Sequence, residues 1–277
     1  MRSKARDVEP TSRRHGLWSS PPSQITLGSH DLHIWKTCLG LPDLAVQRLR
    51  HLLSSHERAR VNRFYSERHR TAFTVARGCL RTILGRYVSA HPYEIEFDYS
   101  AHGKPSITNP AAVAADLRFN LAHSGGLALY AITCGCEIGI DLELIPAEFA
   151  WREIAERFFS ANEVVKLSSL PASIPRRAFF NCWTRKEAFI KAKGVGFSQA
   201  LDQFEVTLGP DEPVALVQTK WDQREPSRWV LKSIDLGEDF AAAMAIEGHD
   251  RKISFWEFDE RMIPVSQSQS SAPLPVG

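Results

Sequence analysis

The sequence predicts an α+β protein of two similar halves, each a small antiparallel sheet covered by helices. Three observations lead to this fold class. Helical and strand-like stretches come in blocks, so that each half of the chain offers a helical block and about three strands. The strands follow one another at short, regular spacing, which favours antiparallel pairing with helices packed on the sheets. The 277 residues, 43% of them hydrophobic and 24% charged, suffice for one large domain or two small ones.

The first half is predicted to hold an early strand, two helical stretches and a set of later strands. In the longer helical stretch, apolar residues recur at helical spacing from Phe73 to Tyr87 and form one stripe. Gly103-Lys104-Pro105 is typical of a turn between short strands. The expected elements are a strand over 32–39, helices over 44–53 and 57–87, a strand and turn over 97–107, and strands over 117–121 and 127–133.

The second half opens with an alternating strand and continues with helices before its later strands. Pro175 precedes the longest of these helices, and Gly194 is expected to end it. The expected elements are a strand over 137–144, helices over 150–159, 162–167 and 177–193, and strands over 204–208, 214–220, 229–234, 240–246 and 252–258.

We therefore expect an N-terminal half over residues 24–136 and a C-terminal half over residues 137–259. The flanking residues 1–23 and 260–277 are rich in proline and serine and are predicted to be disordered. No apolar stretch approaches the ~20 residues of a membrane span, and no apolar core of a secretory signal is visible near the start. The five cysteines do not follow zinc-binding spacing, so we expect reduced thiols in a cytoplasmic protein.

The net charge of +2 is unevenly distributed along the chain. From Arg48 to Arg86 there are ten arginines, no lysine and two acidic residues, hence a local charge of +8. This asymmetry points to a polyanionic partner such as nucleic acid, a nucleotide with several phosphates or an acidic protein, although a solvated basic helix has the same pattern. Arg70, Arg77 and Arg81 align at the edge of the apolar stripe, which suits phosphate recognition by guanidinium groups.

The strand over 137–144 carries two acidic residues on its polar face. Asp141 and Glu143 lie two residues apart, so their carboxylates are about 6–7 Å from each other. Such a pair is either exposed to solvent or bridged by a hard divalent cation such as Mg²⁺. Gly139 lies on the same face and would leave room for a ligand to approach.

The helix over 177–193 places charged residues in line with aromatic ones. Phe180, Trp183, Glu187 and Lys191 fall on nearly one stripe. A Glu and a Lys four residues apart are ordinarily a surface pair on the face opposite the apolar one. At the edge of an aromatic face, the same pair is more typical of a functional site.

His123 and Ser124 end an apolar strand just before two glycines, where a turn can present an imidazole and backbone N–H groups to an anion or simply bond locally. The motifs of α/β-hydrolases, dinucleotide-binding folds and P-loop proteins are absent from the sequence. Paired acids, a third acid with a lysine, a histidine turn and an arginine-rich helix together fit chemistry on a phosphoanhydride.

Five strings resemble, in order and spacing, those of the 4′-phosphopantetheinyl transferases of the surfactin-synthetase type. They are Gly103-Lys-Pro105, Phe119-Asn-Leu-Ala-His-Ser124, Ile138-Gly-Ile-Asp-Leu-Glu143, Arg157-Phe-Phe-Ser160 with Glu163, and Trp183-Thr-Arg-Lys-Glu-Ala-Phe-Ile-Lys191 with Gly194-Val-Gly-Phe197. The resemblance implies two similar α+β halves in a pseudo-twofold arrangement with the site between them. It also implies transfer of 4′-phosphopantetheine from coenzyme A to a carrier-protein serine, with release of adenosine 3′,5′-bisphosphate.

The resemblance also assigns roles to single residues. Asp141, Glu143 and Glu187 match the acids that bind Mg²⁺, for which Mn²⁺ can substitute, and Glu187, Lys191 and Asp141 match the catalytic residues. Ala122 departs from the family's usual serine and removes one hydroxyl donor to a phosphate. The residues implied to bind coenzyme A are Arg58, Arg60, Arg70, Lys104, Pro105, His123, Ser124, Lys186 and Lys191.

Two other functions stay open at this point. One is a non-catalytic homologue that binds coenzyme A or a carrier protein, which would have no need for all four of Asp141, Glu143, Glu187 and Lys191. The other is a Mg²⁺-dependent nucleic-acid enzyme, for which the sequence offers no recognisable binding module. We expect carrier-protein domains and coenzyme A as partners, no nucleic acid and no membrane, and a monomer because the two halves complete one site.

Overall fold

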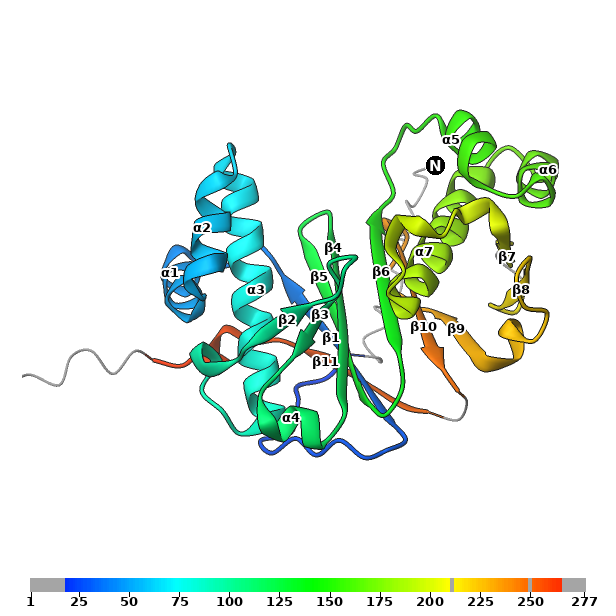
Figure 1. Ribbon diagram of the computed structural model, residues 1–277. Helices are drawn as coiled ribbons and strands as arrows, with labels where there is room; N and C mark the ends of the chain where they lie inside the picture. Colours follow the sequence, from blue (N-terminus) through cyan, green and yellow to red (C-terminus); the bar gives the residue numbers. More distant parts are fainter. Residues whose placement is uncertain (1–17, 210–211, 249–250, 266–277) are drawn as a thin grey trace, which may run out of the picture.

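The computed structural model describes residues 18–209, 212–248 and 251–265, and its helices and strands form two halves that lie side by side (Figure 1). The N-terminal half contains β1 (Asp31–Cys38), α1 (Asp43–Leu52), α2 (Ser55–Arg63), α3 (Glu67–Val88), β2 (Phe97–Tyr99), β3 (Pro105–Ile107), α4 (Pro110–Ala114), β4 (Leu117–Ser124) and β5 (Leu127–Cys134). The later elements are β6 (Ile138–Leu144), α5 (Trp151–Phe158), α6 (Ala161–Ser169), α7 (Pro175–Lys193), β7 (Phe204–Val206), β8 (Leu216–Thr219), β9 (Trp229–Ser233), β10 (Phe240–Glu247) and β11 (Lys252–Glu257). The predicted α+β class is confirmed.

The first sheet has the strand order β11-β1-β5-β4, and α1 and α3 pack on it. Its core includes Trp35, Leu80 and Tyr130, all fully buried. The strands β4, β5 and β1 pair antiparallel as expected, but β11 pairs parallel with β1. The last strand, β11, was expected in the C-terminal half, but it returns to the N-terminal sheet and pairs along the edge of β1.

The second sheet has the order β6-β10-β9, all antiparallel, and α7 lies across one face of it. Alternate residues of β10 on the α7 side are alanines, Ala241, Ala243 and Ala245, so the helix can approach the sheet closely. The predicted end of α7 is confirmed, since Gly194 caps it in the left-handed conformation with a φ of 66°.

Two expectations about single segments are corrected. The helix expected over 57–87 is two helices, because Ser54 and Ser66 each cap a new helix by accepting a backbone N–H three residues later. Residues 18–23 and 260–265 do not form disordered tails: Ser19 N donates to Phe255 O at 3.1 Å, and Ile263 is 1% exposed. The rest of the expected tails, 1–17 and 266–277, lies outside the described residues.

The two halves meet along β4 and β6, which are the edge strands of their sheets and run next to each other (Figure 1). Ile138, Ile140 and Leu142 of β6 fill an apolar cluster with residues of both sheets. This packing uses the apolar face of β6 and turns its acidic residues the other way. Within the described part of the chain, no helix is long and apolar enough to cross a membrane.

A buried histidine in the first sheet predicts a pH-dependent stability. His33 is 3% exposed, and its Nδ1 lies 2.9 Å from the Tyr87 hydroxyl. Burial lowers the pKa of His33 to about 4, with Asp31 opposing and Lys252 adding to the shift. Because the unfolded chain binds this proton more readily, the contribution is complete above about pH 6.5 and is lost as the pH falls towards 4.

By about pH 5, His33 should therefore lower the free energy of unfolding by about 2 kcal/mol relative to neutral pH. Denaturant unfolding of the wild type and of His33→Gln at both pH values measures this. The free energy of the wild type should fall more than that of the variant, and equal losses in the two proteins would contradict the assignment.

Candidate functional site

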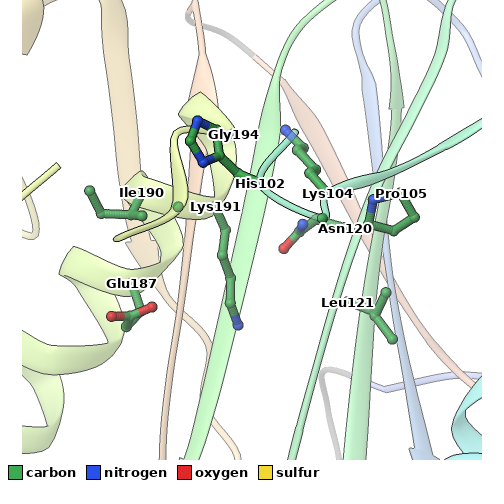
Figure 2. A pocket seen from close by; sticks show the side chains of 11 residues that line it. His102, Lys104, Pro105, Asn120, Leu121, Glu187, Ile190, Lys191 and Gly194 are labelled. Atoms are coloured by element: carbon green, nitrogen blue, oxygen red, sulfur yellow. The ribbon is translucent and has the colours of Figure 1, made fainter. Parts of the chain in front are cut away.

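A cavity of about 290 Å³ opens between the two halves (Figure 2). From one half, the turn between β2 and β3 contributes Lys104, β3 contributes its first residue, Pro105, and β4 contributes Asn120. From the other half, α7 contributes Glu187 and Lys191, the two charged residues of the predicted stripe. Four residues predicted from the sequence thus line one cavity, although they lie up to 87 positions apart in the chain.

Lys191 reaches from α7 to the acidic strand β6. Its Nζ donates to Asp141 Oδ1 at 2.6 Å and to Ile140 O at 3.3 Å. Asp141 is 4% exposed, and its second carboxylate oxygen, Oδ2, is buried and has no hydrogen-bond partner among the residues that the structure describes. Burial raises the pKa of Asp141, while the charge and the hydrogen bond of Lys191 oppose the rise. The unpartnered oxygen is available to a further cation.

Gly139 explains how α7 comes so close to β6. A Cβ atom at this position would lie 2.0 Å from Ala188 O and 2.4 Å from Ala192 N, both in the backbone of α7. The expectation that Gly139 leaves room for a ligand is therefore wrong, because the room is filled by the helix that carries Glu187 and Lys191.

Glu143 and Glu187 complete a group of carboxylates around Asp141. The pKa of Glu143 is raised by burial and then by the charge of Asp141. The pKa of Glu187 is raised by burial, by Asp141 and by Glu143, with Lys191 opposing. Ser124 Oγ donates to Glu143 Oε2 at 2.9 Å and accepts from the Leu144 N–H at 3.1 Å. Like charges held together in this way favour a cation between them.

Carboxylate oxygens are the ligands that Mg²⁺ prefers, so the donor set and the unpartnered Asp141 Oδ2 both fit such an ion. As the side chains stand, however, no three Asp, Glu, His or Cys residues in the described ranges are gathered tightly enough to form a metal site. Lys191 instead supplies the positive charge next to Asp141.

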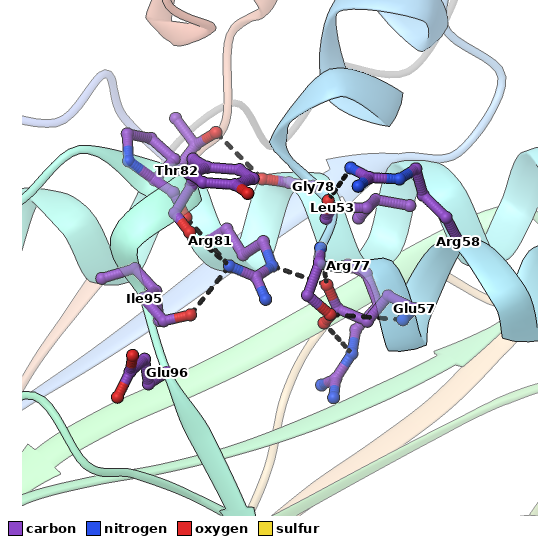
Figure 3. Close-up of polar contacts among 12 residues, drawn as sticks. Leu53, Glu57, Arg58, Arg77, Gly78, Arg81, Thr82, Ile95 and Glu96 are labelled. Carbon is purple, nitrogen blue, oxygen red and sulfur yellow. Dashed lines mark hydrogen bonds and ion pairs between the residues drawn. The ribbon is translucent and has the colours of Figure 1, made fainter.

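The arginine-rich segment is partly buried, which corrects the expected row of phosphate ligands. Arg77 and Arg81 are 6% and 2% exposed, and their Nε atoms lie 3.2 Å and 2.7 Å from the two carboxylate oxygens of Glu57 (Figure 3). Arg81 also donates to the backbone O of Pro92 and of Ile95. These two arginines hold α2, α3 and the following turn together and are not free to bind a phosphate.

Arg58, Arg60 and Arg70 lie on α2 and the start of α3, outside the cavity that contains Glu187. Arg58 donates to Leu53 O, and Arg70 pairs with Glu67 at 2.7 Å. The Arg60 guanidinium is exposed and stacks over the Phe73 ring at 5.1 Å from its centroid. Each remains on the surface, where an anion can reach it.

The expectation that Lys186 binds coenzyme A is wrong. It is fully buried, and its Nζ lies 2.8 Å from Glu163 Oε2 and donates to Leu201 O at 2.8 Å. Although it precedes Glu187, the rotation of about 100° per residue turns Lys186 away from the cavity and into the core. Lys186 therefore joins α7 to α6 and β7.

The end of β4 holds the remaining predicted residues. His123 is exposed, and partial desolvation together with the charge of Lys191 lowers its pKa. Ala122 is 5% exposed within the apolar cluster between the sheets. The expected loss of a phosphate donor at Ala122 is therefore wrong, since its side chain faces the core.

Sequence reasoning gave no role to Asn120, although the structure places it at the junction of the halves. Its Oδ1 accepts the Ile140 N–H at 2.9 Å, next to Asp141 in β6, and its side chain lines the cavity. The available signal was an amide residue in an otherwise apolar strand, Leu117–Ser124. A polar side chain at such a position has to find a buried partner.

Comparisons with known proteins agree on one family. Residues 137–245 match the model of the 4′-phosphopantetheinyl transferase superfamily, and residues 43–134 match that of the 4′-phosphopantetheinyl transferase N-terminal domain. The chain is 39% identical over 241 residues to 4′-phosphopantetheinyl transferase HetI from a Nostoc species, covering 87% of this chain and 98% of the relative. It is 30% identical over 217 residues to 4′-phosphopantetheinyl transferase Sfp from Bacillus subtilis, covering 77% and 92%.

Proposed function

The chain belongs to the 4′-phosphopantetheinyl transferase superfamily and transfers the phosphopantetheine group of coenzyme A to a carrier protein, and we propose that the reaction takes place at the cavity between its halves. The observation that carries this proposal is that Glu187 and Lys191 line that cavity while Lys191 Nζ contacts Asp141 of β6. The acceptor would be a serine hydroxyl of the carrier, and adenosine 3′,5′-bisphosphate would be the other product.

Mg²⁺, or Mn²⁺ in its place, is the proposed cofactor, held by Asp141, Glu143 and Glu187. Support comes from the unpartnered Asp141 Oδ2 and from the raised pKa values: beyond the effect of burial, Asp141 raises the pKa of Glu143, and both acids raise the pKa of Glu187. When bound, such an ion neutralises charge on the pyrophosphate of coenzyme A. Glu143 and Glu187 are only partly buried, so their carboxylates remain accessible to such an ion.

Glu187 is the proposed base that takes the proton from the carrier serine. A raised pKa makes a carboxylate a stronger base at neutral pH, and the cavity gives it access to a substrate. Lys191 would place its ammonium group against the phosphate that leaves, while it also orients Asp141.

The remaining proposed contacts to coenzyme A come mostly from the N-terminal half. Arg58, Arg60 and Arg70 would meet its phosphates as surface cations, His123 would lie near the same groups, and Pro105 would line the nucleotide's path. The two halves of one chain would suffice as a monomer. All five cysteines are free thiols, which supports action in the reducing cytoplasm.

The direct test is the intact mass of an apo carrier protein after incubation with this protein, coenzyme A and Mg²⁺. A gain of one phosphopantetheine group that disappears with a chelator is the expected result. Fatty-acid, polyketide and peptide carriers should be tried in parallel. If none gains mass while coenzyme A still binds, the protein is a binding homologue and the proposed chemistry is wrong.

Ser124 should influence the metal requirement through Glu143. Ser124→Ala removes the donor that fixes Glu143 Oε2, so the Mn²⁺ dissociation constant should rise about tenfold. Ser124→Thr keeps the hydroxyl group and should stay close to the wild type. Calorimetric titration of Mn²⁺ into each protein measures this effect without turnover, and unchanged affinity in the alanine variant would exclude the role.

A further inference from the structure

We propose that Lys104 is a positioning residue that ties the two halves together at the cavity, and that its ammonium group is not a ligand of the nucleotide. The inference rests on the proposed function, because it assigns Lys104 to the wall of the same cavity. It follows from the contacts of the Lys104 side chain, from the turn that packs against it and from the charges around it.

The Lys104 ammonium group bonds to two segments of the C-terminal half, the residue before β6 and the end of α7. Nζ donates to Glu137 Oε2 at 2.6 Å, just before β6, and to Ala192 O at 2.8 Å, in the last turn of α7. Lys104 itself lies at the turn between β2 and β3 of the N-terminal half. One side chain therefore connects three segments, and its positive charge lies at the helix end where carbonyl groups lack intrahelical partners.

The chain that follows α7 packs directly against this turn. A Cβ atom on Gly194 would lie 3.2 Å from Lys104 Cδ, and one on Gly196 would lie 3.0 Å from His102 Cβ. Both glycines have positive φ angles, 66° and 54°, so this route of the backbone is open mainly to glycine. Residues of both segments line the cavity.

The surrounding charges hold Lys104 in this place. Its side chain is 18% exposed, and that of Glu137 is 36% exposed. Glu137 also accepts from Arg118 at 3.0 Å, so the carboxylate is fixed from both sides. Glu137 and Ala192 O take two of the three N–H donors of the ammonium group. A phosphate on the third donor would lie beside the Glu137 carboxylate, and the two negative charges would repel each other.

The experiment compares Lys104→Met, Glu137→Gln and the double variant. If Lys104 acts as a tie, both single variants weaken coenzyme A binding about tenfold, and the double variant is no weaker than the worse single one. In transfer assays the KM for coenzyme A should rise while kcat stays within about twofold. In the absence of ligand, backbone amides over 193–198 should exchange hydrogen faster in all three variants.

If Lys104 instead contacts a phosphate directly, Glu137→Gln should change the affinity for coenzyme A in the opposite direction. Glu137→Gln would release Lys104 to the nucleotide, so coenzyme A would bind as tightly as to the wild type or more tightly, and that result overturns the proposal. Unchanged amide exchange over 193–198 also overturns it. Lys166→Met is the matched control, because it removes a lysine from an ion pair with Glu212 inside the C-terminal half.

Failure of this inference and failure of the proposed function are distinguishable. Amide exchange and coenzyme A titration require no carrier protein and no turnover, so they test the tie even if the wild type transfers nothing. Suppose that the wild type transfers nothing but binds coenzyme A tightly, and that Glu137→Gln binds it more weakly. The role of Lys104 would then still be supported, whereas the proposed transfer chemistry would be wrong.

Discussion

Glu187→Gln is expected to lower the rate of phosphopantetheine transfer by about 10²–10⁴-fold while the affinity for coenzyme A stays near that of the wild type. The glutamine side chain keeps the size and the position on α7 but cannot accept a proton. The cavity that Glu187 lines would keep its shape, and the N-terminal residues proposed to hold the nucleotide would be untouched. Single-turnover transfer to an apo carrier and calorimetric titration of coenzyme A measure the two quantities separately.

Glu156→Gln is a suitable control, because this exposed residue of α5 loses the same charge away from the cavity. Near-normal transfer by Glu187→Gln would show that another group takes the proton from the carrier serine. A loss of coenzyme A affinity as large as the loss of rate would point to a binding role and would remove Glu187 as the base.

The sequence predicted those parts of the site that depend on periodicity within one element. The alternation of β6 placed Asp141 and Glu143 on one face, and that face is opposite the apolar cluster between the sheets. The helical period placed Glu187 and Lys191 together at the edge of the aromatic stripe, and both line the cavity. Local geometry is fixed by the backbone, so a short range of residues is enough for such predictions.

Predictions were less successful for residues whose role depends on a partner that is distant in the sequence. Arg77 and Arg81 have the spacing of a phosphate site, but Glu57, 20 and 24 residues earlier, turns them into a buried network. Lys186 is next to a site residue yet pairs with Glu163, which no periodicity connects to it. A buried cation is stable only with a partner, and the identity of that partner is decided by the packing of whole elements.

Gly139→Ala is expected to have the second large effect, because it changes the distance between β6 and α7. The added methyl group would lie 2.0 Å from Ala188 O and 2.4 Å from Ala192 N, and neither backbone atom can rotate away. The helix would have to move by on the order of 1 Å to restore contact distances. We expect a loss of about 3 kcal/mol in the free energy of unfolding, as for an overpacked core.

The shift of α7 in Gly139→Ala should also lower the rate of transfer, in addition to its effect on stability. Lys191 Nζ lies 2.6 Å from Asp141 Oδ1, so a shift of α7 lengthens the contact that fixes both groups. A displacement of about 1 Å can lower turnover about 10²-fold, and this loss should persist at temperatures where the variant is fully folded. Gly40→Ala is the control, because in the described part of the chain its new methyl group would meet Cys38 Sγ only at 3.8 Å, an ordinary van der Waals contact. Denaturant unfolding and transfer assays on both variants decide the point: wild-type turnover in folded Gly139→Ala would mean that the spacing of β6 and α7 does not set the geometry of the site.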